Sequence, residues 1–212
     1  MAPVPTLATP TARRRVTIEE WLAIPDERRA ELIDGKIVHQ GMPGPLHGKA
    51  QGKTFAQVDG PFGRTPGDRG RPGGWWISLE VDLEIAGFGC RPDILGWRRD
   101  KHPRLPEPDP RGVVVAVPEW ICEVLSPRTA SMDLGKKRRA YHSAGVAHYW
   151  IIDPTNATLT VLEHAERDYL IVLGAGRGEV VNAPPFEGAS LDLDEIFEPE
   201  AAAETPGETP GS

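Results

Sequence analysis

The sequence predicts one α/β domain in which buried strands are joined by helices. The main observation is the stretch 118–154, where an apolar run at 120–125 precedes a helical pattern over 131–144 and a second apolar run at 148–152. A run that is apolar at nearly every position is typical of a strand covered on both faces. The 212 residues and the hydrophobic content of 39% suit one domain with a full core and two tails.

The two ends of the chain differ in composition from its centre. Residues 1–15 are rich in Pro, Ala and Thr, and residues 198–212 are acidic and contain Pro and Gly, so we expect two disordered tails around a domain at 16–197. No stretch has the apolar length of a signal peptide or a membrane span. We therefore expect a cytoplasmic protein with no membrane partner.

The first half of the domain begins with a short helix and a hairpin. Thr17 and Glu20 form a capping-box pattern at the helix start. Asp34-Gly35 then joins two short strands between Glu31 and Val38. A second helix is predicted over 47–58.

Residues 76–85 alternate between apolar and polar positions, which predicts one strand with a polar face. Its acids, Glu80, Asp82 and Glu84, could form a metal cluster, but an exposed strand face also explains their spacing. The next strand starts after Pro92-Asp93. A basic loop at 98–112 follows it directly, so its positive charge could lie near Asp93.

Towards the end of the domain, the sequence predicts a hairpin and a last helix. Residues 159–162 and 169–173 form the two strands of the hairpin. Residues 191–197 form the short terminal helix.

The predicted helix over 131–144 places a lysine on its core-facing side. Leu134 and Tyr141 share one stripe at helical spacing, and Lys137 falls on the same stripe. One reading is that the stem of Lys137 lies along the core while its ammonium reaches solvent. The other is that it pairs with Glu123, the only acid in the preceding apolar run.

A second acid could meet Glu123. If Asp93 and Glu123 lie on the same face of neighbouring strands, their oxygens suit Mg²⁺ or Mn²⁺. Taken alone, an Asp that follows Pro at a strand start is more often a turn residue.

Several short motifs follow one another along the chain. They are ELIDGKIV at 31–38, His47, Pro92-Asp93, Glu123–Pro127, Asp133-Leu134 with Lys137 and Tyr141, Gly145-Val146 with Tyr149-Trp150, and Asp153-Pro154. In this order and spacing they resemble the Uma2 family of endonucleases, within the PD-(D/E)XK restriction-endonuclease-like superfamily. The resemblance extends from Val16 to about Phe197.

This resemblance implies a restriction-endonuclease-like mixed sheet flanked by helices, with the C-terminal hairpin added. It implies that Asp93 and Glu123 bind Mg²⁺ or Mn²⁺, that Lys137 is catalytic and that Glu31 helps to complete the site. The superfamily lysine normally stands two residues after the acid, where this chain has Leu125. Lys137 on the following helix takes its place in this family.

The predicted function is therefore metal-dependent hydrolysis of nucleic-acid phosphodiesters, with DNA expected before RNA. Because cutting a duplex needs two cuts, we expect a homodimer. The alternative is a catalytically inactive nuclease-fold module for binding or regulation. The charge favours this alternative: of the formal net charge of −7, four negatives are glutamates of the tail at 198–212, which leaves −3 for residues 1–197.

Overall fold

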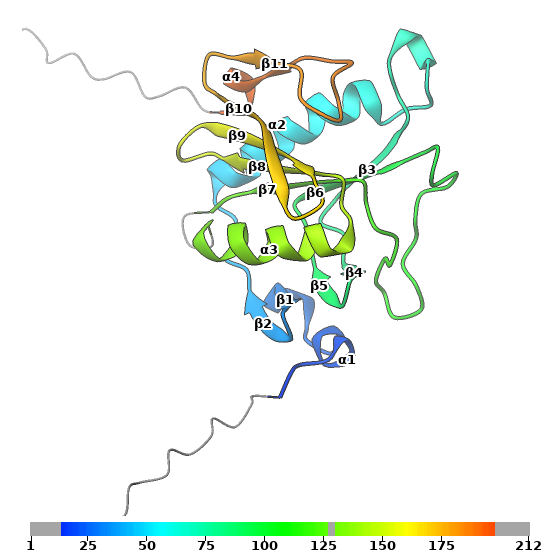
Figure 1. Ribbon diagram of the computed structural model, residues 1–212, viewed down its shortest axis with the longest axis vertical. Coiled ribbons are helices and arrows are strands. Elements are labelled where there is room, and N and C mark those ends of the chain that lie inside the picture. Colours follow the sequence, from blue (N-terminus) through cyan, green and yellow to red (C-terminus); the bar gives the residue numbers. More distant parts are fainter. Residues whose placement is uncertain (1–13, 127–129, 198–212) are drawn as a thin grey trace, which may run out of the picture.

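The centre of the protein is a six-stranded sheet with the strand order β10-β9-β8-β7-β6-β3 (Figure 1). The structure is a computed structural model and describes residues 14–126 and 130–197, so most of both predicted tails lies outside the described residues. The strands are β3 (Trp75–Leu79), β6 (Ile94–Arg98), β7 (Trp120–Val124), β8 (His148–Asp153), β9 (Thr158–His164) and β10 (Tyr169–Gly176). β7 and β8 pair in parallel and the other neighbours are antiparallel, so the sheet is mixed, as predicted.

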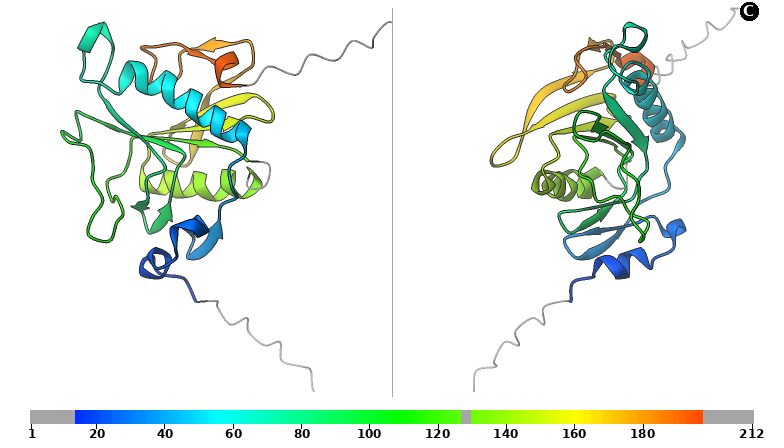
Figure 2. Two further views of the ribbon diagram at one scale, coloured as in Figure 1. Left: turned by 180° about the vertical axis from the view of Figure 1, so that it is seen from behind. Right: turned by 90° about the vertical axis from the view of Figure 1, so that its right-hand side faces the viewer.

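A helix covers each face of this sheet (Figure 2). α3 (Ala130–Ala144) connects β7 to β8 on one face, and α2 (Pro45–Phe62) lies on the other. The parallel pair needs such a crossover, because the chain must return to the same end of the sheet. Buried side chains fill both layers, with Trp120 and Trp150 on the α2 side and Tyr149 on the α3 side. The prediction that residues 120–125 are covered on both faces is confirmed.

A smaller sheet, with the order β2-β1-β5-β4, brings Glu31 to α3. Its strands are β1 (Ala30–Ile33), β2 (Lys36–His39), β4 (Leu83–Ile85) and β5 (Phe88–Cys90). The predicted hairpin is its first pair, and the turn residues Asp34 and Gly35 have φ values of 53° and 71°, which suit Asp and Gly. The short helix α1 (Ile18–Leu22) packs on this sheet and has the predicted capping box.

The prediction of one strand over 76–85 is wrong. β3 ends at Leu79 in the large sheet, and β4 begins at Leu83 in the small one. Glu80, between them, has a left-handed backbone with φ of 50°, which ends an extended strand. The alternation of side chains does not reveal this break, because the residues on both sides of it are extended.

The C-terminal elements complete the fold. The predicted hairpin consists of β9 and β10 and extends the main sheet, since β9 also pairs with β8. The predicted terminal helix is shorter than 191–197: β12 (Leu191–Asp192) pairs with β11 (Val180–Val181) and leads into α4 (Leu193–Ile196). None of the helices in the described ranges has the length and apolar character needed to cross a membrane.

Candidate active site

β6 and β7 place the two predicted metal ligands side by side. Ile94 stands opposite Cys122 in the antiparallel register, so the next position sets Asp93 opposite Glu123 on the same face. Asp93 Oδ2 accepts the backbone N–H of Val124 at 2.7 Å, which ties the two strand ends together. Asp93 and Glu123 are only 6% and 4% exposed, so both acids stand inside the fold.

Lys137 points from α3 to Glu123. Its Nζ lies 3.0 Å from Glu123 Oε1, and the residue is 2% exposed, which excludes the reading in which the ammonium reaches solvent. Tyr141, one turn further along α3, donates its hydroxyl to the same oxygen at 2.5 Å. The side chain of Leu134 lies outside the described residues. The pairing of Lys137 with Glu123 is therefore confirmed.

Glu31 enters the same cluster from β1. Its Oε1 lies 3.1 Å from Lys137 Nζ and accepts the backbone N–H of Arg91 at 3.0 Å. Lys137 therefore bridges two buried carboxylates that come from two different sheets.

His47, one of the residues that carry the family resemblance and one to which no role was assigned from the sequence, lies against Asp93. Its Nε2 is 3.2 Å from Asp93 Oδ1. Gln51, one turn later on α2, donates its side-chain N–H to the backbone carbonyl of Asp93 at 3.0 Å. The spacing of four residues puts both side chains on one helix face. The four-residue spacing of His47 and Gln51 points to a site only when the start of α2 is known to lie beside Asp93.

Asp93, Glu123, Lys137 and His47 line one pocket, with a free volume of about 30 Å³. The remaining lining residues are Arg29, Gln40, Gly41, Pro43, Val124 and Ser126. Of the described acids near Lys137, Glu31 is not part of the lining. About 10–15 Å³ holds one water molecule, so the pocket has room for a small ion or for ordered water.

The donors of this pocket suit a divalent cation. Asp93 and Glu123 provide hard carboxylate oxygens, and Mg²⁺ is commonly held by one or two carboxylates while it keeps several waters. The described residues contain no group of three or more His, Cys, Asp and Glu side chains arranged around an ion. Two carboxylates beside a small cavity with room for water therefore fit Mg²⁺ or Mn²⁺ better than a cation that requires a complete protein cage.

Burial raises the pKa of Glu123 to about 8. Lys137 lowers this pKa, whereas the charges of Asp93 and Glu31 raise it further. A proton therefore competes with a cation for the Glu123 carboxyl near neutral pH. Burial and the nearby Glu123 also raise the pKa of Tyr141 well above its ordinary value, so its phenol remains a hydrogen-bond donor.

The acids of 80–84 do not form a metal cluster. Each is half-buried and lies near an arginine: Glu80 is 3.5 Å from Arg29, Asp82 is 2.5 Å from Arg91, and Glu84 is 2.6 Å from Arg111. Each acid therefore takes part in an ion pair of its own, and the face that the alternation predicted to be exposed is only partly exposed.

The expectation that the basic loop at 98–112 lies near Asp93 is wrong. The loop leaves from the far end of β6, and none of its residues belongs to the described lining of the pocket. Arg98 instead pairs with Asp100 at 2.7 Å within the loop.

Comparison with known proteins shows the family and the fold. The family model of Uma2, described as putative restriction endonuclease, matches residues 17–194. A solved structure from Anabaena variabilis, described as a putative nuclease belonging to DUF820, superimposes with a TM-score of 0.67 at 22% identity. The match covers 85% of this chain and 97% of that one, which shows a shared restriction-endonuclease-like fold. A search of curated proteins gave no significant match. The chain belongs to the Uma2 family of putative restriction endonucleases.

Proposed function

We propose that this protein is an endonuclease that depends on a divalent metal and hydrolyses phosphodiester bonds of nucleic acid, with DNA as its substrate. The observation that carries the proposal is the convergence of Asp93, Glu123 and Lys137 on one pocket. A buried carboxyl with a shifted pKa beside a cation is typical of functional sites. Membership of the Uma2 family supports the same class of reaction.

In the proposed site, Asp93 and Glu123 hold Mg²⁺ or Mn²⁺. When bound, such an ion supplies Lewis-acid stabilisation of the charge that develops on the phosphate. Lys137 places a positive group at the same pocket, where it stabilises that charge directly. Glu31 and Tyr141 act through their neighbours, because they hold Lys137 Nζ and Glu123 Oε1 in place.

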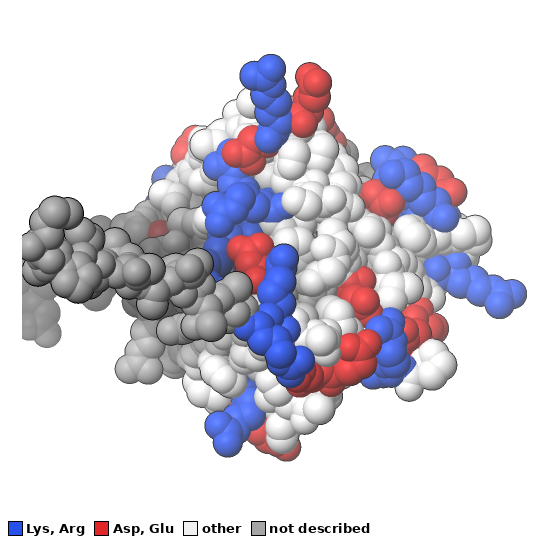
Figure 3. Space-filling view, turned by 60° about the horizontal axis from the view of Figure 1, so that its bottom comes forward, with Lys and Arg blue, Asp and Glu red and all other residues white. Residues whose placement is uncertain are grey.

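The proposal is tested by incubating the purified protein with duplex DNA, single-stranded DNA and RNA, each with Mg²⁺, Mn²⁺ or EDTA. We expect cleavage of DNA with either metal and none with EDTA. If the folded protein cuts no substrate, the catalytically inactive binding or regulatory module becomes the better reading. That alternative draws support from the charge of −3 on residues 1–197, and from the mixture of Lys, Arg, Asp and Glu over the face in Figure 3.

Metal binding should become tighter as the pH rises towards 8. The raised pKa of Glu123, about 8, means that a cation must displace a proton at lower pH, while above that pH the carboxylate is already free. The affinity for Mn²⁺ should change by up to about tenfold per pH unit below pH 8. Thermal melts with millimolar Mn²⁺ at pH 6 and pH 8.5 measure this, since a ligand of the native state raises the melting temperature. A larger shift at pH 6, or melts insensitive to Mg²⁺ and Mn²⁺ at both pH values, would contradict the assignment.

We also propose a homodimer, with β10 as the contact between the two copies. β10 is one of the two edge strands of the main sheet, and its residues Leu170, Ile171 and Val172 are 62%, 66% and 43% exposed. An apolar edge strand is a place where a second chain can pair. Light scattering of the purified protein should give the mass of a dimer, and Ile171→Lys should give a monomer. A monomeric wild type at high concentration counts against the dimer, and a dimeric Ile171→Lys counts against this interface.

A further inference from the structure

Arg29 lines the same pocket as Asp93 and Glu123, and the proposed chemistry leaves it without a role. It follows a short 3-10 helix at Asp26–Arg28 and leads into β1. Its side chain is 20% exposed, so it is largely enclosed but still open to the pocket. The guanidinium of Arg29 is enclosed in a pocket with Asp93 and Glu123 but makes no ion pair with either of these two described residues. It can therefore bind another anion.

The guanidinium of Arg29 is held only loosely. Its Nη2 lies 3.5 Å from Gln40 Oε1 and its Nη1 lies 3.5 Å from Glu80 Oε2, both long for charge-assisted hydrogen bonds. Its Nε is buried and finds no hydrogen-bond partner among the described residues. Because Nε is buried, the donors of Arg29 that can reach a ligand are those of its two Nη groups, and their contacts among the described residues are only these two long ones.

Arg91, which lies near it, shows how a structural arginine is bound in this protein. Its Nε and Nη2 donate to the two oxygens of Asp82 at 2.8 and 2.5 Å, a bidentate pair. Arg91 and Arg29 both line a second small pocket next to the first. The two arginines therefore lie in the same region, but only Arg91 makes short hydrogen bonds to a carboxylate.

The backbone of Arg29 is also in an unfavourable region. Its φ and ψ are 43° and 54°, the left-handed conformation that disfavours residues with a Cβ atom. Its backbone is fixed there, because its N–H donates to Asp26 O at 2.9 Å and its carbonyl accepts the N–H of Gln40 at 2.8 Å. Glycine would fit this conformation without strain, and retained strain is more common at functional sites than elsewhere.

We infer that Arg29 binds a phosphate group of the nucleic-acid substrate in the pocket that Asp93 and Glu123 line. A guanidinium fork matches two oxygens of a phosphate, which would replace the two long contacts to Gln40 and Glu80. The identity of the substrate in this inference rests on the proposed function. Arg29 would then position the phosphate from within the pocket that Asp93 and Glu123 line.

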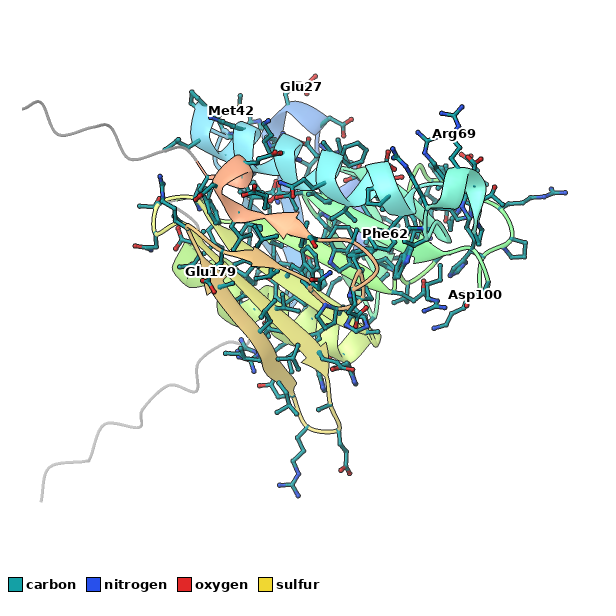
Figure 4. All side chains as sticks on the ribbon, turned by 90° about the horizontal axis from the view of Figure 1, so that it is seen from above. Glu27, Met42, Phe62, Arg69, Asp100 and Glu179 are labelled. Atoms are coloured by element: carbon teal, nitrogen blue, oxygen red, sulfur yellow. The ribbon has the colours of Figure 1, made fainter. Side chains whose placement is uncertain are left out.

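The test compares Arg29→Gln and Arg29→Gly with Arg69→Gln. Arg69 is a matched control, because it is exposed and also has a left-handed backbone, with φ of 52°. Figure 4 shows it at the end of α2 opposite to Met42, whose neighbours Gly41 and Pro43 line the pocket. Binding of a labelled duplex of mixed sequence is measured by fluorescence anisotropy at pH 7 in EDTA, over a series of salt concentrations.

Both Arg29 variants should bind the duplex roughly tenfold more weakly, and the slope of log affinity against log salt should decrease in magnitude by about 0.9, the value for one lost phosphate contact. Arg69→Gln should leave both unchanged. Arg29→Gly relieves the backbone strain, so its melting temperature should be no lower than that of the wild type, and the binding result stands even if Arg29→Gln folds poorly. Unchanged affinity and slope in Arg29→Gly would overturn the inference, as would an equal loss in Arg69→Gln.

Cleavage assays on the same proteins separate this inference from the proposed function. A wild type that cuts DNA while Arg29→Gly cuts and binds equally well overturns the role of Arg29 alone. A wild type that binds through Arg29 but cuts nothing supports the role of Arg29 and overturns the proposed enzyme. A wild type that neither binds nor cuts overturns both.

Discussion

Replacing Asp93 or Glu123 by alanine is expected to abolish cleavage of nucleic acid while the protein remains folded. Each variant removes one of the two carboxylates that face the pocket, so the proposed cation would lose half of its protein ligands. We expect a loss of at least roughly a thousandfold in rate, about 4 kcal/mol of barrier. Cleavage is measured at saturating Mg²⁺, with circular dichroism and thermal melts as checks of the fold.

Two further variants separate catalysis from structure. Asp93→Asn keeps an oxygen that can accept the N–H of Val124, so a loss of activity in this variant is not due to the loss of that bond. Glu119→Ala is the matched control, because Glu119 is also a buried acid, 8% exposed, that accepts the backbone N–H of Arg98 at the opposite end of β6. If Asp93→Ala or Glu123→Ala cuts as well as the wild type, the assigned site is wrong. An equal loss of activity in Glu119→Ala would also show this.

The part of the site that could be predicted from the sequence depends on short-range periodicity. Helical spacing placed Lys137 and Tyr141 on one inward stripe, and the apolar run around Glu123 marked a buried strand with one misplaced acid. Both patterns are local. The helical stripe contains the charged residue Lys137, and the apolar run contains the charged residue Glu123. Because an unpaired buried charge is so costly, the two residues implied each other, and the contact of 3.0 Å bears this out.

The part that could not be predicted depends on packing between distant segments. His47 and Arg29 reach the pocket only because the start of α2 and the small sheet dock beside the ends of β6 and β7. No periodicity in either segment carries that information. In the same way, the left-handed backbone of Glu80 divides residues 76–85 between two sheets although their alternation is continuous. The α/β class could therefore be predicted from local patterns and the restriction-endonuclease-like sheet from the family resemblance, whereas the walls of the pocket could not be predicted.

Replacing Lys137 should lower the cleavage rate by ten- to a thousandfold, roughly 1.4 to 4 kcal/mol of barrier, while metal binding survives. Lys137→Ala removes the cation proposed to stabilise the phosphate, and Lys137→Met does so while filling the same space. Since Lys137 lowers the pKa of Glu123, its loss should raise that pKa above about 8 and move metal binding to higher pH. Activity is therefore compared at a pH and Mn²⁺ concentration at which melts show the variant to be saturated.

Lys136→Ala is the control for this prediction. Lys136 neighbours Lys137 on α3 but is rotated by about 100° around an ideal helix, and it does not belong to the described lining of the pocket. We expect it to retain activity, with at most a slightly weaker contact to nucleic acid. Lys137→Met should melt below the wild type, because it leaves the buried carboxylates of Glu31 and Glu123 without the cation between them. A catalytic role for Lys137 thus requires a loss of rate in protein that melts and circular dichroism show to be folded and metal-bound at the assay temperature. Full activity in Lys137→Met, or an equal loss in Lys136→Ala, would reduce Lys137 to a structural link between Glu31 and Glu123.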